Sequence, residues 1–253
     1  MKLLPESIRA KLKVKHLNSQ ARLGKFLLTS AFAGTLFLGA PQIPALSAPE
    51  QIHFDVKLNS RQQFLLDLQK ITDPQNQEQE ISDIYLKNFN LKAYAKYEGE
   101  RLNRSYGLIG AEQHMPRFPG DTAEQHGQFI QSGITPGKGA WGYVPDVEKE
   151  KYYVAVQTLY LPDWTTRLAY LRDWYKYRKV VVTNPVNGKT IIAVVADSGP
   201  SWWTGKHFGG SPEIMAYLGL NVGMQKGPVV LFFVDDPGDK IPLGPLEEPL
   251  KND

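Results

Sequence analysis

An aspartate at the end of an apolar run offers the clearest chemistry in this chain. Asp197 directly follows residues 191–196, which are all apolar. A carboxylate at the exit of a buried strand is partly desolvated, which raises its pKa and lets it hold a proton near neutral pH. Asp197 could therefore act as a general acid and base. The alternative is a turn residue that accepts main-chain N–H groups ahead of Gly199 and Pro200.

The loop that follows Asp197 carries side chains suited to a sugar ligand. Trp202 and Trp203 present indole faces that stack on sugar rings, although adjacent tryptophans are as often core anchors. In an extended loop, the two rings cannot face the same way. Lys206 could pair with carboxylates of the ligand, and His207 could exchange protons. The expected substrate-binding residues are Ser198, Trp202, Trp203, Lys206 and His207.

The residues before Asp197 predict a β-hairpin. Two β-branched runs lie at residues 179–184 and 189–196, and Asn187 and Gly188 stand between them. An Asn-Gly step between two such runs is among the strongest short hairpin signals. Asp197 is therefore expected to emerge from the second strand of an antiparallel pair.

One short helix and a last strand are predicted after the aromatic loop. Ser211 suits the N-cap, Pro212 suits the first helical position, and Gly219 suits the position just past the end. Residues 227–235 form a buried strand in this interpretation. Several short strands with one small helix before the last favour a closed all-β barrel over alternating βαβ units.

This order of elements resembles the double-psi β-barrel of the rare lipoprotein A family, with expansins and membrane-bound lytic transglycosylase A as more distant relatives. The resemblance covers residues 180–234 well and residues 106–160 loosely. It is carried by the hairpin, the Asp-Ser-Gly-Pro step at residues 197–200 and the Ser-started helix that ends in Leu-Gly-Leu. The resemblance implies a mainly β fold, a six-stranded double-psi barrel with short helices.

The resemblance also implies a function. The catalytic or polysaccharide-contacting aspartate of the family falls on Asp197, which implies lytic transglycosylase-like cleavage of peptidoglycan glycan strands. In that reaction one carboxyl group protonates the glycosidic oxygen and then helps the sugar's own 6-hydroxyl close a 1,6-anhydro ring. No cofactor is implied. The first alternative is a non-catalytic, expansin-like module that binds glycan and loosens the wall, and the second is a structural barrel of the envelope.

The chain departs from the family pattern at three positions. Ser198 replaces an arginine, and Gly209 stands where the family has an aspartate two residues before the helix-starting serine. Pro119 stands where the family has a histidine. This leaves His114 or His126 as a substitute for that histidine.

His114 and His126 lie in a stretch that also holds three carboxylates, at Glu112, Asp121 and Glu124. Their spacing matches no closed zinc-binding pattern. They are therefore expected to be solvated loop residues, with no metal site.

The charge distribution argues for export and against nucleic acid. The first 25 residues hold seven Lys or Arg against one Glu. Since the whole chain carries +3 and this leader +6, the remaining 228 residues carry −3, so they lack the basic surface that nucleic acids require. Residues 26–40 are uncharged and are followed by Pro41, Pro44 and small residues up to Ala48, as in a signal peptide or membrane anchor.

Either interpretation of the leader places the body in the periplasm, in the cell wall or on the outer face of the cytoplasmic membrane. The membrane would be contacted only through the N-terminal segment. The chain has no cysteine, which removes disulfides and a lipoprotein anchor. The expected parts are a signal peptide or anchor at residues 1–48, a helical or linker segment at 49–100, the barrel domain at 101–238 and a flexible Pro-rich tail at 239–253.

Overall fold

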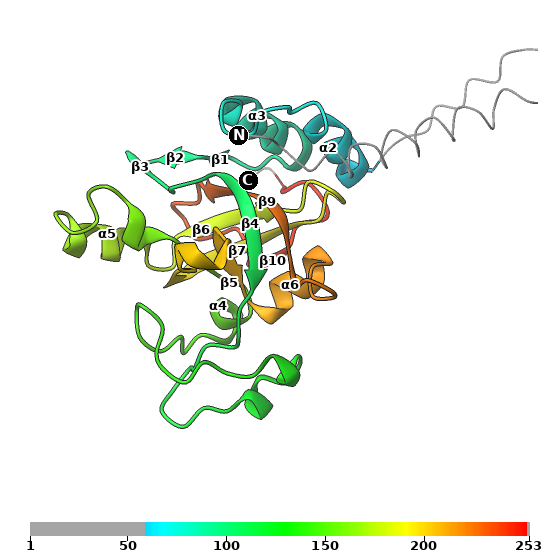
Figure 1. The fold of residues 1–253 in the computed structure, drawn as a ribbon. Helices are drawn as coiled ribbons and strands as arrows, with labels where there is room; N and C mark the ends of the chain where they lie inside the picture. Colours follow the sequence, from blue (N-terminus) through cyan, green and yellow to red (C-terminus); the bar gives the residue numbers. More distant parts are fainter. Residues whose placement is uncertain (1–58, 252–253) are drawn as a thin grey trace, which may run out of the picture. The chain divides into compact units, whose positions relative to one another are not determined.

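The computed structural model describes residues 59–251 of the chain (Figure 1). The expected signal peptide or anchor at residues 1–48 lies outside this range. Within the described part of the chain, no helix has both the length and the apolar character that a membrane span requires.

Six strands close into a barrel (Figure 1). Following the hydrogen bonds around the barrel gives the order β9, β4, β8, β5, β7, β6 and back to β9. The pairs β4–β8 and β5–β7 are parallel, and the other four pairs are antiparallel. The six-stranded barrel expected from the resemblance is confirmed. The strands are β4 (Tyr106–Ala111), β5 (Tyr153–Val156), β6 (Lys179–Thr183), β7 (Thr190–Ser198), β8 (Phe208–Gly210) and β9 (Lys226–Val234).

Shorter elements complete the fold. Strand β1 (Ala93–Tyr94) pairs with β9, and β10 (Gly244–Pro245) pairs with β7. Strands β2 (Lys96–Tyr97) and β3 (Glu100–Arg101) pair with each other. The α-helices are α2 (Ser60–Leu68), α3 (Glu78–Phe89), α4 (Val147–Lys151), α5 (Leu168–Tyr175) and α6 (Pro212–Leu218).

The predicted hairpin and helix are both confirmed. Strands β6 and β7 pair from Lys179↔Val194 to Thr183↔Thr190. In helix α6 the Ser211 side chain accepts the main-chain N–H of Ile214, and the C-cap residue Gly219 has a φ of 73°. That positive φ is readily adopted by glycine, which is why the helix ends there.

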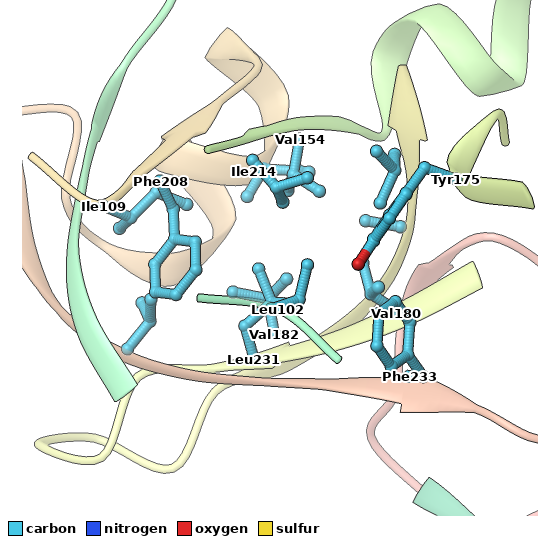
Figure 2. Packing of buried hydrophobic residues seen from close by; sticks show 14 of the residues in the cluster. Leu102, Ile109, Val154, Tyr175, Val180, Val182, Phe208, Ile214, Leu231 and Phe233 are labelled. Atoms are coloured by element: carbon cyan, nitrogen blue, oxygen red, sulfur yellow. The ribbon is translucent and has the colours of Figure 1, made fainter. Parts of the chain in front are cut away.

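The barrel strands are apolar on both faces because both faces are covered. Alternate residues of β6, β7 and β9 point into the barrel, where they pack around Phe208 and Ile214 (Figure 2). The residues between them belong to a second cluster. The inward set is Val180, Val182, Ile191, Ala193, Val195, Val229, Leu231 and Phe233, and the outward set is Val181, Ile192, Val230, Phe232 and Val234.

Helices α2 and α3 cover this second cluster. Of the segment at residues 49–100, expected to be helical or a linker, the described part holds helices α2 and α3 and then strands β1 and β2, and it packs on the barrel. The Tyr85 ring lies 5.3 Å from that of Phe64 and 5.9 Å from that of Phe232 between centroids. Its hydroxyl group is 2.8 Å from the Thr183 hydroxyl, so the helices are joined to strand β6 by a hydrogen bond as well.

The C-terminal segment is also held against the domain. Residues 239–253, expected to be a flexible tail, contribute strand β10 and the buried side chain of Leu246. The main-chain N–H of Leu250 donates to the carbonyl of Phe89 at the end of α3 (2.8 Å). The described part of this segment is therefore ordered by sheet pairing and burial.

The longest departure from the barrel joins β4 to β5, and we call residues 112–152 the β4–β5 excursion. It forms the green loops that extend away from the barrel in Figure 1. It contains the 3-10 helices η1 (Ala123–His126) and η2 (Ile130–Ser132) and the helix α4. Its own apolar cluster with the barrel is small and consists of Met115, Val144, Tyr153 and Ala196, and its Trp141 is buried in the main core.

The helical cover should contribute to the stability of the barrel. We expect Phe64→Ala to lower the free energy of unfolding by about 3–5 kcal/mol, because it removes a buried ring from the cluster over β6 and β9. Urea unfolding of the full chain would measure this. Leu66→Ala is the matched control, because that side chain lies in the same helix and is 46% exposed. Equal, small losses for both variants would mean that the helices do not stabilise the barrel.

Candidate functional site

Asp197 belongs to a row of residues that crosses four strands of the barrel. Asp197 on β7 pairs with Ala155 on β5, Ala155 pairs with Gly209 on β8, and Gly209 pairs with Gly110 on β4. Paired residues of neighbouring strands share a face of the sheet. The half-buried Asp197 carboxyl therefore stands at the end of a row of three small residues, which we call the small-residue row.

Two charged side chains lie over the glycines of this row. A Cβ atom on Gly110 would overlap the side chain of Lys206, and one on Gly209 would overlap the carboxylate of Glu112. Because neither glycine has a side chain, Lys206 and Glu112 lie flat against the strands. Lys206 Nζ donates to the carbonyl of Ala111 (3.1 Å). Glu112 interacts electrostatically with both Lys206 and Asp197, so the three side chains form a charged row, which we define as Lys206, Glu112 and Asp197.

Glu112 supplies a carboxylate close to the position where the family pattern has an aspartate and this chain has none. The resemblance puts an aspartate at position 209, and this chain has Gly209 there. The Glu112 side chain, which follows β4, occupies the space beside the Gly209 backbone. Sequence reasoning missed this role and grouped Glu112 with the solvated residues near His114. No local signal could have found it, because it depends on the parallel pairing of β4 with β8.

Burial shifts the pKa of both carboxyl groups in the same direction. Desolvation raises the pKa of Asp197, while main-chain N–H groups of Ala140 and Ser198 act against that shift. The Ala140 N–H lies 2.8 Å from Asp197 Oδ1. Desolvation also raises the pKa of Glu112, with Lys206 lowering it and Asp197 raising it further. Each carboxyl group therefore holds its proton to a higher pH than a solvated one would.

The geometry of Asp197 agrees in part with each of its two expected roles, the turn residue and the general acid and base. The carboxylate accepts main-chain N–H groups, as a turn residue does. It is nevertheless half-buried rather than enclosed, and it borders a face that carries a second carboxyl group. The residue can therefore be fixed in position and still reach a ligand.

The tryptophans of the loop after β7 are surface residues. Trp202 and Trp203 lie in the 3-10 helix η4 (Trp202–Thr204) and are 69% and 70% exposed, which excludes the core-anchor alternative. Their rings are nearly perpendicular, at 83° and 6.1 Å between centroids, so they face different ways as expected. The Gln157 side-chain amide donates to the carbonyls of Pro200 (2.9 Å) and Lys206 (3.2 Å), which holds both ends of the loop.

His207 and Ser198 use their polar groups within the protein. The main-chain N–H of Leu108 donates to His207 Nδ1 (2.9 Å), so that nitrogen carries no proton. Burial and then the charge of Arg104 lower the pKa of His207, which also favours the neutral ring. The Ser198 hydroxyl lies 2.6 Å from that of the buried Thr158. Of the expected substrate-binding residues, these two hold the loop and strand in place.

His114 and His126 are not solvated, so that expectation was wrong. Their side chains are 0% and 1% exposed. Both rings contact the carboxylate of Glu150, which comes from helix α4 and was not among the expected neighbours. Since both rings are enclosed, neither is available as the substitute for the family histidine missing at Pro119.

The fold and the site together define a six-stranded mixed barrel with a charged row over small residues and two exposed indoles in the loop after β7. No protein-family model matches the chain, and a search of curated proteins found no match. A search of solved structures found a similarity to cerato-platanin 3 from M. perniciosa, at 17% identity and a TM-score of 0.30, covering 51% of this chain and 94% of that one. The function therefore has to be inferred from the geometry of the site itself.

The raised pKa of Asp197 predicts a pH-dependent effect on stability. Above the ordinary value of 3.8 the folded state holds the Asp197 proton longer than the unfolded chain does, so this residue's contribution to stability falls as pH rises. Asp197→Asn removes that loss and can still accept the Ala140 N–H. We expect the variant to gain stability relative to the unaltered chain between pH 4 and pH 7, measured by urea unfolding at each pH.

Asp173→Asn is the control for this measurement, since that carboxyl group lies exposed on α5. Its stability difference from the unaltered chain should stay nearly constant over the same range. An Asp197→Asn difference that is equally flat would show that the burial of this carboxyl group has no energetic consequence.

Proposed function

We propose that this protein binds glycan strands of the cell wall along its charged row. The observation that supports this most directly is the charged row itself, because Lys206 and Glu112 lie flat over Gly110 and Gly209 and so form a low polar surface. Trp202 and Trp203 are exposed in the loop between Asp197 and Lys206 and suit stacking on sugar rings. Exposed aromatic rings together with a low polar surface suit a polysaccharide better than a compact apolar ligand.

The charges of the row suit the polar groups of a wall glycan. The carboxylates of Glu112 and Asp197 would accept hydrogen bonds from sugar hydroxyl and amide groups. Lys206, whose ammonium group is held at the Ala111 carbonyl, would pair with the carboxylates of muramyl or peptide groups. The resemblance of residues 180–234 to the rare lipoprotein A and expansin barrels supports the same ligand class.

The location that we propose follows from the leader. Its basic stretch, uncharged run and small-residue exit support export, and the ligand class requires it. The protein would then act in the periplasm or cell wall, or on the outer face of the cytoplasmic membrane. Contact with the membrane would be limited to the N-terminal segment.

Binding without cleavage is the reading that the site supports best. Ser198 stands in place of the family arginine and is hydrogen-bonded to Thr158, and His114 and His126 are too enclosed to replace the missing histidine. The N–H groups around Asp197 stabilise its ionised form and so act against its role as an acid. The site is thus closer to an expansin-like binding module than to a complete lytic enzyme.

Lytic cleavage is the second candidate, and the raised pKa of Asp197 favours it. Protonated Asp197 would donate its proton to the glycosidic oxygen as the bond from that oxygen to the sugar's C1 breaks. The 6-hydroxyl oxygen of the same sugar would then bond to C1, and its proton would pass to the Asp197 carboxylate. Ionised Glu112 would stabilise the positive charge that develops at C1. The product would be a 1,6-anhydro sugar, with no water consumed.

Removal of both indoles should weaken glycan binding. We expect Trp202→Ala/Trp203→Ala to bind purified sacculi about tenfold more weakly, a loss of about 1.4 kcal/mol, because the stacking faces are gone. Co-sedimentation over a range of sacculus concentrations would measure this. Val186→Ala is the matched control, because Val186 is 70% exposed but lies in the β6–β7 turn. Equal binding by both variants would exclude the aromatic loop from the site.

A second measurement separates binding from cleavage. We expect the unaltered chain to bind sacculi without releasing 1,6-anhydro muropeptides, and Asp197→Asn and Glu112→Gln each to weaken binding, because each substitution removes a charged acceptor from the row. Mass spectrometry of the soluble fraction would detect any product. Release that Asp197→Asn abolishes would replace the binding module with the lytic enzyme. If the chain neither binds sacculi nor releases product, both candidate functions are overturned.

A further inference from the structure

A second polar cluster lies inside the β4–β5 excursion, apart from the residues of the charged row. His114 Nδ1 is 3.1 Å from Glu150 Oε1, and His126 Nδ1 is 2.9 Å from Glu150 Oε2. All three side chains are at most 1% exposed. Their nitrogen and oxygen ligand atoms lie within 4.8 Å of one another. The excursion therefore brings two imidazoles and one carboxylate together in a dry environment.

The contacts of the two histidine rings need more N–H groups than two neutral imidazoles supply. His114 Nε2 faces the carbonyl of Gln128 (3.2 Å), and His126 Nε2 faces Asp121 Oδ2 (3.1 Å). All four ring nitrogens therefore face an oxygen acceptor. A neutral imidazole has one N–H, so two neutral rings supply two protons for four contacts.

Two arrangements satisfy these contacts. In one, both rings are imidazolium ions, with their centroids only 4.4 Å apart and away from water. Burial acts against the charged form of His114, while the Glu150 carboxylate favours it and raises the pKa of that ring. In the other, a divalent cation takes the place of two protons on the Nδ1 side, and each neutral ring keeps one proton on Nε2. The total charge is the same in the two arrangements.

The Nε2 contacts match the surroundings of metal-binding histidines. Such a histidine usually donates its other ring N–H to a carboxylate or a main-chain carbonyl, which fixes the tautomer and the ring orientation. His126 has the carboxylate of Asp121, and His114 has the carbonyl of Gln128. Asp121 is itself held by Arg117, whose Nε lies 2.9 Å from Asp121 Oδ2. The outer partners of a metal site are thus in place.

We propose that His114, His126 and Glu150 bind one divalent metal ion of the zinc class. The ligand atoms would be Nδ1 of each histidine and a carboxylate oxygen, a combination typical of zinc and unlike the all-oxygen sites of magnesium and calcium. Zinc bonds of about 2.0–2.1 Å in a tetrahedral arrangement place ligand atoms about 3.3 Å apart. The Nδ1-to-oxygen distances of 3.1 and 2.9 Å lie close to that spacing, so small side-chain shifts would admit the ion.

The carboxylate of Glu213 adds to the attraction for a cation. It interacts electrostatically with both His114 and Glu150. Among the described residues, its Oε2 is the one buried side-chain nitrogen or oxygen atom with no hydrogen-bond partner. A positive ion at the cluster would compensate for this oxygen without any contact to it.

The ion would fasten a segment that has little apolar core of its own. Its three ligands come from the start, the middle and the end of the β4–β5 excursion, so one ion would close two loops. The same excursion carries Ala140, whose N–H binds Asp197. All three ligands are at most 1% exposed, so a substrate would not reach the ion, and the role that we assign to it is structural. This inference does not depend on the proposed glycan binding.

The test uses the untagged full-length chain and Zn²⁺ alone. After incubation with Zn²⁺ and dialysis, elemental analysis should find about one zinc per chain, and Glu150→Gln should retain little. Asp121→Asn should bind about 10–100-fold more weakly, because it removes an outer partner and leaves the ligands in place. Glu124→Gln is the matched control: it removes an exposed carboxylate from the same excursion and should bind like the unaltered chain.

A spectroscopic readout covers the case in which Glu150→Gln fails to fold. In ¹⁵N NMR of the unaltered chain, one equivalent of Zn²⁺ should shift the side-chain signals of two of the five histidines. A folded chain that binds no zinc and shows no such shift would overturn the proposal and leave the imidazolium arrangement. Equal zinc binding by folded Glu150→Gln would place the ion elsewhere and overturn it as well.

Discussion

The candidate site depends on one constraint, the register of four neighbouring barrel strands. Parallel pairing of β4 with β8 and of β5 with β7 puts Gly110, Gly209, Ala155 and Asp197 in one row. A larger residue at either glycine would take the space that Lys206 or Glu112 now occupies. The lack of a side chain at these two glycines therefore makes room for Lys206 and Glu112 beside Asp197. Shifting any of these strands by one residue would turn the row to the other face of the sheet.

The chemistry of this row follows from how little water reaches it. Burial raises the pKa of both Asp197 and Glu112, and the two negative charges repel each other. The protein offsets this with the ammonium group of Lys206 and with the N–H groups of Ala140 and Ser198. Each carboxyl group is thus partly desolvated and still has a charged or hydrogen-bonding partner.

The sequence predicts the parts of this structure that local signals determine. Strands β6, β7 and β9, the Asn-Gly turn and helix α6 depend on β-branched runs and on single turn or cap residues, and all are found as expected. The place of Glu112 and the contact of Glu150 with two histidines depend instead on strand closure and on a helix at the end of a long excursion. The exposure of Trp202 and Trp203 was also undecided, since composition does not distinguish an anchor from a surface pair. Long-range packing decided each of these cases.

The β4–β5 excursion shows how a segment with little apolar surface can still position a functional group. Its buried apolar side chains include Met115, Trp141 and Val144, whereas its interior holds two imidazoles, two carboxylates and a guanidinium group joined by hydrogen bonds. A buried polar network stabilises a unique arrangement only when every member is satisfied. With no cysteine in the chain, this network takes the place that a disulfide could have had. Ala140, whose N–H binds Asp197, belongs to the same excursion, and its neighbour Trp141 is buried in the main core and donates to the carbonyl of Arg172.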